Sequence, residues 1–212
     1  MNGLLVAIKS EIFVALRTFA SKLIVTAPAL VAATQLMLVK LTEAGQQTRD
    51  SILGGGSFEQ SVANNAYGFF VDGLITGLTM LGLLLVAQGA YSFSYDRDVG
   101  SIRHLLIRRV SRSSVLTAKL IHLHLLALLS VLLLLTTSYL LSGMLWEYGA
   151  IVEDGFELIS EQEIREEIGL GLRLALVPLP AAIALGLLIS VSTQSATQAV
   201  TTALGITLAI DI

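Results

Sequence analysis

The sequence predicts an all-α membrane protein, and three features of the chain lead to this fold class. Hydrophobic residues make up 54% of the 212 residues, charged residues only 14%, and the mean hydropathy is +0.79. Soluble chains carry about 25% charged residues, so this chain has too few charges to cover a water-soluble globule. Four long stretches contain no Asp, Glu, Lys or Arg: Leu23–Val39, Gly73–Tyr95, Leu120–Trp146 and Leu174–Ile210. They are rich in leucine, alanine and glycine and lack the period-2 alternation of a membrane β-barrel.

Composition also excludes several classes of protein. Intrinsic disorder requires low hydrophobicity and high net charge, and this chain has neither. The absence of cysteine excludes a disulfide scaffold and a thiolate metal site. A net charge of −3 argues against a nucleic-acid-binding protein, which normally carries a basic surplus. We therefore expect no nucleic acid among the partners of this chain.

The N-terminal arm, residues 1–21, has the pattern of an amphipathic helix. Its apolar residues recur at spacings of three and four: Leu5, Ile8, Ile12, Leu16 and Phe19. We expect this arm to lie in the membrane interface as an elbow helix and then to bend into the bilayer. A plain cytoplasmic extension of the first span is the alternative interpretation.

Each charge-free stretch should cross the membrane as a helix. A span needs about 20 apolar residues, and lipid offers no partner for unpaired backbone N–H and C=O groups. The last stretch is too long for one span and contains a polar turn at 192–198, so it divides into two. The expected spans are about 22–40, 72–95, 117–146, 172–191 and 198–212. Within them, Gly73, Gly77 and Gly82 are expected to allow close helix packing.

The charged residues between the spans set the expected orientation. Nine of the 13 basic residues lie in residues 1–22 and in the 96–119 segment, whereas the 40–72 and 147–173 segments are acidic. The positive-inside rule then places the N-terminus and the 96–119 segment in the cytoplasm. The acidic segments lie outside. In the external loop 147–171, Ser160-Glu161-Gln162-Glu163 matches a capping box that leads into a helix.

The second cytoplasmic segment carries a pattern of its own. Gly100 is expected to break the second helix and Ser101 to cap a short new one, while Ser113 or Ser114 can cap the third span. The apolar stripe of the short helix consists of Ile102, Leu105, Leu106 and Val110, and its basic residues include Arg103, Arg108 and Arg112. We interpret 100–112 as a basic amphipathic helix. A solvated basic loop that only sets the topology is the alternative.

This segment resembles the cytoplasmic loop between spans two and three in permeases of type-2 ABC exporters. Those loops often show an acidic cluster, a Gly-Ser/Thr-Leu/Ile step, a leucine pair, then Pro-Val/Ile-Ser-Arg and a lysine that opens the third span. The matching residues here are Asp96, Asp98, Gly100-Ser101-Ile102, Leu105-Leu106, Val110-Ser111-Arg112 and Lys119, with Arg109 where the family commonly has proline. The elbow helix, the cytoplasmic N-terminus and the span order extend the resemblance over most of the chain.

The resemblance implies a membrane-spanning permease subunit of an ATP-driven exporter for a hydrophobic or amphipathic substrate, in a bacterial cytoplasmic (inner) membrane. A separate ABC ATPase subunit would dock on the 100–112 coupling helix, and a second permease copy would complete a homodimer or heterodimer. The docking residues would be Asp98, Gly100, Ser101, Ile102, Arg103, Leu105, Leu106, Arg109 and Arg112. Such permeases usually have six spans, so we expect a further span after residue 212.

The resemblance also places the catalytic chemistry outside this chain. No G-x-x-x-x-G-K-[ST] phosphate loop occurs in the sequence. ATP and Mg²⁺ would therefore bind to the ATPase partner, while this chain would be no enzyme and would hold no cofactor. His122 and His124 lie about 200° apart around a helix, so no metal site is expected from them.

Polar residues and prolines within the spans offer further candidate sites. Gln88, Thr136, Thr137, Ser138 and Gln194 could line a transport pathway or could hydrogen-bond between helices. Pro178 and Pro180 could kink the fourth span at its outer end or form an exit gate. The acidic external loop could contact an accessory protein, and membrane lipid is an expected partner. A membrane enzyme using the external acids and a non-transporting scaffold are the alternative functions.

Overall fold

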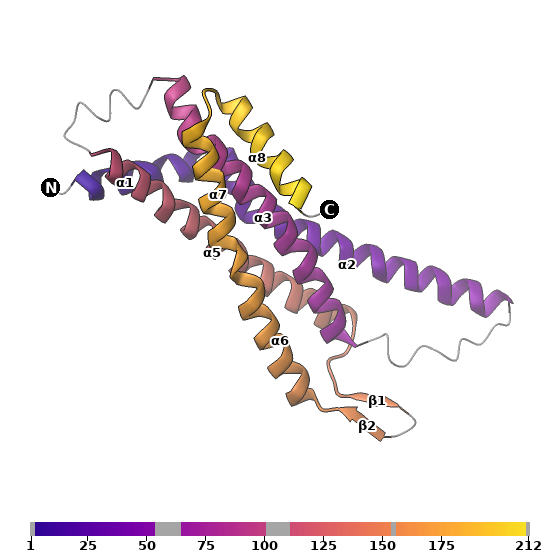
Figure 1. The fold of residues 1–212 in the computed structure, drawn as a ribbon. Helices are drawn as coiled ribbons and strands as arrows, with labels where there is room; N and C mark the ends of the chain where they lie inside the picture. The colour runs from indigo at the N-terminus through magenta and orange to yellow at the C-terminus, as the bar shows by residue number, and fades with distance from the viewer. Residues whose placement is uncertain (1–2, 54–64, 101–110, 154–155, 211–212) are drawn as a thin grey trace. The chain divides into compact units, whose positions relative to one another are not determined.

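The computed structural model describes residues 3–53, 65–100, 111–153 and 156–210 (Figure 1). Its helices and strands, in chain order, are α1 (Gly3–Arg17), α2 (Phe19–Leu53), α3 (Ala66–Asp98), α5 (Arg112–Leu145), β1 (Ile151–Glu153), β2 (Phe156–Ile159), α6 (Glu161–Leu176), α7 (Pro178–Ser192) and α8 (Ala196–Ile210). Helices dominate the described residues, and the predicted all-α class is confirmed.

Among the described residues, four helices are long and apolar enough to cross a membrane: Phe19–Gln46, Ala66–Asp98, Ser113–Leu145 and Glu161–Ser192. These helices are compatible with an integral membrane protein. The expected fifth span, 198–212, falls on α8, a shorter apolar helix of 15 residues. At 1.5 Å per residue α8 is about 22 Å long, less than the ~30 Å of a hydrocarbon core.

The helices extend beyond the apolar stretches that indicated them. α2 continues to Leu53, although the first span was expected to end near residue 40, and α3 begins at Ala66 rather than near 72. Hydropathy indicates which part of a helix is apolar enough for the lipid interior. Helix propensity and backbone hydrogen bonding decide where the helix ends. Residues 41–53 contain no proline and several good helix formers, so the helix persists beyond its apolar part.

Two helix starts are set by serine side chains. At α5, the Oγ of Ser111 accepts a hydrogen bond from the N–H of Ser114 at 3.1 Å, so Ser111 is the cap and the expectation of Ser113 or Ser114 was wrong. At α6, the predicted capping box is confirmed. Ser160 N–H and Oγ donate to Glu163 Oε2 at 3.0 and 2.9 Å, and the Glu163 N–H donates back to Ser160 Oγ.

A short antiparallel hairpin, β1 with β2, precedes the helix that was expected in the 147–171 loop. The strands pair Val152 with Glu157 and Glu153 with Phe156. The sequence between them is Asp154-Gly155, which lies outside the described residues. Asp-Gly between residues of high β-propensity is a strong hairpin signal, and it is the signal that could have indicated these strands.

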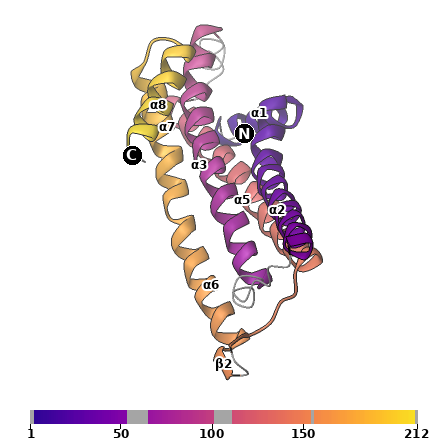
Figure 2. The ribbon, with the colours of Figure 1, turned by 90° about the vertical axis from the view of Figure 1, so that its right-hand side faces the viewer.

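Contacts divide the chain into two units, each with buried clusters of its own. The helices can be followed along the chain by colour in Figures 1 and 2. The first unit contains Met1–Ala27, Thr79–Val131 and Val177–Ile212; the second contains Pro28–Leu78 and Leu132–Leu176. Helices α2, α3 and α5 contribute to both.

In the first unit, α3 and α7 approach backbone to backbone. A Cβ atom added to Gly186 would lie 2.5 Å from the carbonyl oxygen of Val86, and one added to Gly89 would lie 3.2 Å from Gly186 Cα. α8 packs beside them, because Ala199 and Ala203 share a buried cluster with Val86, Ala90 and Ile189. Only glycine permits this approach, and the sequence pattern did not reveal the pair.

In the second unit, α2, α3 and α5 pack through small residues. An added Cβ on Gly77 would lie 2.3 Å from Leu134 Cδ1, and one on Gly73 would lie 3.3 Å from Ser138 Oγ. The expected close packing at these two glycines is confirmed. At Gly82 the expectation was wrong, because an added Cβ there meets nothing within 4 Å.

The only tryptophan of the chain anchors one end of the second unit. Trp146 is buried, stacks on Phe69 with ring centroids 3.9 Å apart, and donates from Nε1 to Glu43 Oε2 at 2.9 Å. Lys40 lies over its ring and pairs with Glu43. Nearby, burial raises the pKa of the Tyr148 phenol above its ordinary value. This end of the unit is therefore fixed by aromatic packing.

Candidate functional site

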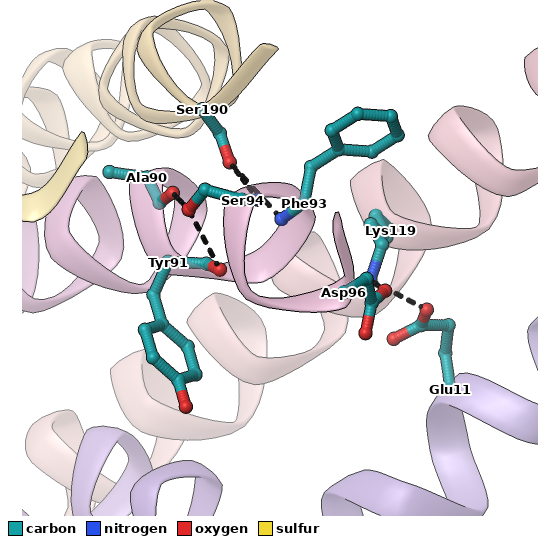
Figure 3. Close-up of polar contacts among 8 residues, drawn as sticks. All are labelled: Glu11, Ala90, Tyr91, Phe93, Ser94, Asp96, Lys119 and Ser190. Atoms are coloured by element: carbon teal, nitrogen blue, oxygen red, sulfur yellow. Dashed lines mark hydrogen bonds and ion pairs between the residues drawn. The ribbon is translucent and has the colours of Figure 1, made fainter. Parts of the chain in front are cut away.

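A buried ion-pair cluster joins three helices of the first unit. The ammonium group of Lys119, on α5, lies 2.6 Å from Asp96 Oδ2 on α3 and 2.9 Å from Glu11 Oε1 on α1 (Figure 3). The Lys119 side chain is only 3% exposed, whereas those of Glu11 and Asp96 are 19% and 22% exposed. A buried ammonium is tolerated only when opposite charges compensate its desolvation. The two carboxylates supply that compensation and hold the three helices together.

Apolar contacts seat α1 on the same part of α5. Ala7 packs against Val115 and Ala118 in a small buried cluster, with Ile8 beside it. Ala118 directly precedes Lys119, so the apolar contact and the ion pair act on the same turn of α5. The predicted amphipathic arm is therefore attached to the start of α5 by both its apolar face and Glu11.

The end of α3 also holds the turn between α7 and α8. The Arg97 guanidinium donates to the carbonyl oxygens of Ser190, at 2.9 Å, and of Thr193. The Asp98 carboxylate accepts from the N–H of Ala196 at 2.8 Å. Carbonyls at a helix C-terminus carry partial negative charge and N–H groups at an N-terminus partial positive charge. The two side chains thus complement both helix ends that meet at this turn.

Ser190 adds a contact one turn earlier on α3. Its Oγ accepts hydrogen bonds from the backbone N–H of Phe93, at 3.1 Å, and of Ser94, at 2.9 Å (Figure 3). Ser94 Oγ in turn donates to the carbonyl oxygen of Ala90 at 2.6 Å. All three groups are buried or partly buried, so α3 and α7 are linked by polar contacts beside their glycine contact.

These contacts hold together the end of α3 and the beginning of α5, which lie on either side of the predicted coupling helix in the sequence. α3 ends at Asp98, and Gly100 follows with φ of +76°, a left-handed conformation that favours glycine. Arg112 is the first residue of α5. The remaining predicted docking residues lie outside the described residues: Ser101, Ile102, Arg103, Leu105, Leu106 and Arg109.

The residues expected to line a pathway fall into both units. Gln88 and Gln194 belong to the first unit, Gln194 being exposed in the turn after α7. Thr136, Thr137 and Ser138 belong to the second; Thr136 donates to its own helix at Leu132, and Ser138 is fully buried with its Oγ unpaired. The pathway stays a prediction.

The two prolines mark a break in helical hydrogen bonding. Pro178 is the first residue of α7, and Pro180 follows within its first turn. Val177, between α6 and α7, keeps helical dihedral angles of −60° and −39°. Proline lacks an N–H and is well tolerated at the start of a helix. The break is therefore local, and a gate at this position stays a prediction.

Sequence reasoning missed the buried state of Lys119 and its partner Glu11. The sequence pattern places Lys119 at the start of the third span and Asp96 in an acidic cluster, and it does not indicate that the two are in contact. An ionisable side chain near the end of an apolar stretch, with a carboxylate on a neighbouring amphipathic helix, is the signal that could have found them. Within the described ranges, no group of three or more His, Asp or Glu side chains could hold a metal ion.

Fold and site together define a helical protein whose described residues include four potential membrane-crossing helices and a buried charge cluster near the ends of α3 and α5. The family model described as "Protein of unknown function (DUF2705)" matches residues 52–209, more than half of the sequence, so the chain belongs to that family. No curated protein and no solved structure matches it.

Proposed function

We propose that this chain is the permease subunit of a type-2 ABC exporter and moves a hydrophobic or amphipathic substrate out of a bacterial cell. In this proposal the N-terminus and the 96–119 segment face the cytoplasm, α8 is a fifth membrane helix, and a second permease copy completes the transporter. A separate ATPase subunit binds ATP and Mg²⁺ and docks on the 100–112 segment.

The observation that carries the proposal is the Lys119 cluster. A docked ATPase must pass its movement to the membrane helices through the two ends of the docking segment. Asp96 and Lys119 lie on either side of that segment in the sequence, are ion-paired, and share Glu11 of the amphipathic arm. A displacement of the segment would therefore act on α1, α3 and α5 together.

The contacts of Arg97 and Asp98 support the same mechanism. They bind the end of α3 to the turn that joins α7 and α8. In the proposed orientation this turn is also cytoplasmic. The movement of one docking segment would then reach α1, α3, α5, α7 and α8, as a permease driven by a cytoplasmic ATPase requires.

Copurification tests whether an ATPase docks on this segment. The tagged chain is expressed with each candidate ATPase from the same genome, captured in detergent, and assayed for MgATP hydrolysis. Ile102→Asp and Leu106→Asp are expected to abolish the captured activity. Leu158→Asp, an exposed leucine of β2 that the proposal places outside, is the matched control and should retain it. The proposal fails if no ATPase is captured, or if the docking variants capture as much as the control.

A fluorescent label tests the coupling itself. The sequence has no cysteine, so a single Cys at exposed Gln194 can carry an environment-sensitive fluorophore. MgATP is expected to change its emission in the captured complex. Glu11→Gln, which removes one partner of Lys119, should reduce that change while the ATPase remains bound. An unaltered response in Glu11→Gln would contradict the coupling role of the cluster.

A further inference from the structure

A cleft in the first unit lies between α1, the start of α2 and the first half of α5. Its volume is about 390 Å³, within the range of small-molecule sites. Most of its lining is apolar, with Ile12 and Leu16 from α1, Val25 from α2, and Leu125, Leu126 and Leu129 from α5. No Asp or Glu lines it.

The walls of the cleft belong to segments that suit the membrane. α2 and α5 contribute residues from within two of the four potential spans, and Leu125 and Leu129 remain 42% and 52% exposed. On α1, Phe13 and Leu16 are exposed, at 56% and 71%. Apolar surface of this kind on an amphipathic helix is stable in a membrane interface, so lipid chains are the natural neighbours of the cleft.

The polar residues of the cleft give it a positive edge. Lys22 lines the cleft and is exposed, and no ion pair joins it to another residue of the described chain. His122 also lines the cleft. Lys9 and Arg17 of α1 are exposed nearby in the sequence. An apolar interior with a cation at its edge complements an anionic headgroup that carries an acyl chain.

We propose that this cleft binds an anionic phospholipid, with an acyl chain between α1 and α5 and the phosphate at Lys22. The inference goes beyond the exporter function and needs only that the chain lies in a membrane. Because the cleft separates α1 from the turn of α5 that follows Lys119, a bound lipid would also support the seating of the amphipathic arm.

Quenching by brominated lipid tests the site directly. The only tryptophan, Trp146, is replaced by phenylalanine, and Leu125→Trp places a reporter at the cleft. The protein is reconstituted in phosphatidylcholine vesicles that contain either dibrominated phosphatidylglycerol or dibrominated phosphatidylcholine at the same mole fraction. From the quenching of this reporter, phosphatidylglycerol is expected to bind about fivefold more tightly than phosphatidylcholine. A difference of this size corresponds to the attraction of one cation near the membrane surface for an anionic headgroup. A Leu188→Trp reporter, exposed on α7 of the same unit and not among the residues that line the cleft, should show no preference.

Two matched variants assign the preference to the cleft. Lys22→Gln should abolish the preference for phosphatidylglycerol, because Lys22 is the only lysine or arginine among the described residues that line the cleft. Lys9→Gln makes the same charge change on exposed α1 outside the cleft and should leave the preference intact. Both positions are exposed, so folding should be preserved. Equal quenching by the two lipids at Leu125→Trp, or equal loss in both lysine variants, would overturn the proposal.

Discussion

The ammonium nitrogen of Lys119 lies 2.6 Å from a carboxylate oxygen of Asp96, and this pair joins the first turns of α5 to the last turn of α3. The lysine side chain is almost completely buried, and Glu11 of α1 provides a second carboxylate at 2.9 Å. The two residues bracket the segment proposed to dock an ATPase. Their contact therefore fixes the two ends of that segment relative to each other.

Lys119→Met is expected to destabilise the protein by roughly 3–5 kcal/mol, because it leaves two carboxylates without their shared partner. Thermal unfolding in detergent, followed by size-exclusion chromatography, measures the effect. Lys9→Met is the control: Lys9 is exposed and in no ion pair found among the described residues, so its loss should change stability by less than about 0.5 kcal/mol.

The double variant Lys119→Met with Asp96→Asn separates charge from packing. Neutralising Asp96 as well removes one of the uncompensated charges. The destabilisation of the double variant should therefore be smaller than the sum of the two single destabilisations. If they add fully, the ion pair does not stabilise the helix ends in the way proposed here.

Gly186→Ala is expected to destabilise the first unit by about 1–3 kcal/mol, because the new methyl group would lie 2.5 Å from the Val86 carbonyl oxygen. The helix backbone at Val86 cannot move away from the new methyl group as a flexible side chain could. Gly82→Ala is the matched control on α3, since an added Cβ there meets nothing within 4 Å. It should be neutral or slightly stabilising, by up to about 1 kcal/mol. Equal melting temperatures for the two variants would contradict the close approach of α3 and α7.

Asp98→Ala is expected to loosen the start of α8, because the N–H of Ala196 loses its acceptor. Loss of a capping interaction costs about 1 kcal/mol. Amide hydrogen exchange across residues 195–199 should therefore become several-fold faster, and exchange in α6 should not change. Asp98→Asn keeps an acceptor oxygen and should have a smaller effect. The idea fails if the exchange rates of α8 are the same in wild type and Asp98→Ala.

Ser160→Ala and Glu163→Ala each disrupt the capping box of α6 and should lower the melting temperature, and the loss of the Ser160 cap should cost about 1 kcal/mol of stability. Neither should affect ATP hydrolysis by a captured ATPase, because these groups are engaged at a helix start. Glu157→Gln, an exposed carboxylate of β2, is the control for a simple loss of charge. If the chain were an enzyme that uses its external acids, Glu163→Gln would instead abolish its activity at unchanged stability.

Local sequence patterns predicted the elements that depend on local chemistry. The capping box at Ser160 and Glu163 and the close packing at Gly73 and Gly77 were indicated by residue type and spacing, and the structure contains them. Helices α2 and α3 extend beyond the apolar stretches of the sequence, since hydropathy indicates which residues suit lipid and not where helical hydrogen bonds stop. The β1–β2 hairpin was not among the expected elements, because strands of three and four residues are too short to show a clear alternation of apolar and polar residues.

By itself, the sequence determined the helical class and the distribution of charge along the chain. Both follow from composition and periodicity, which act over a few neighbouring residues. Only the tertiary structure decided that Lys119 is buried between Glu11 and Asp96, that Arg97 and Asp98 hold the turn before α8, and that Gly89 meets Gly186. These contacts join residues far apart in the chain, and no local pattern specifies which distant partner a buried charge or a glycine will meet.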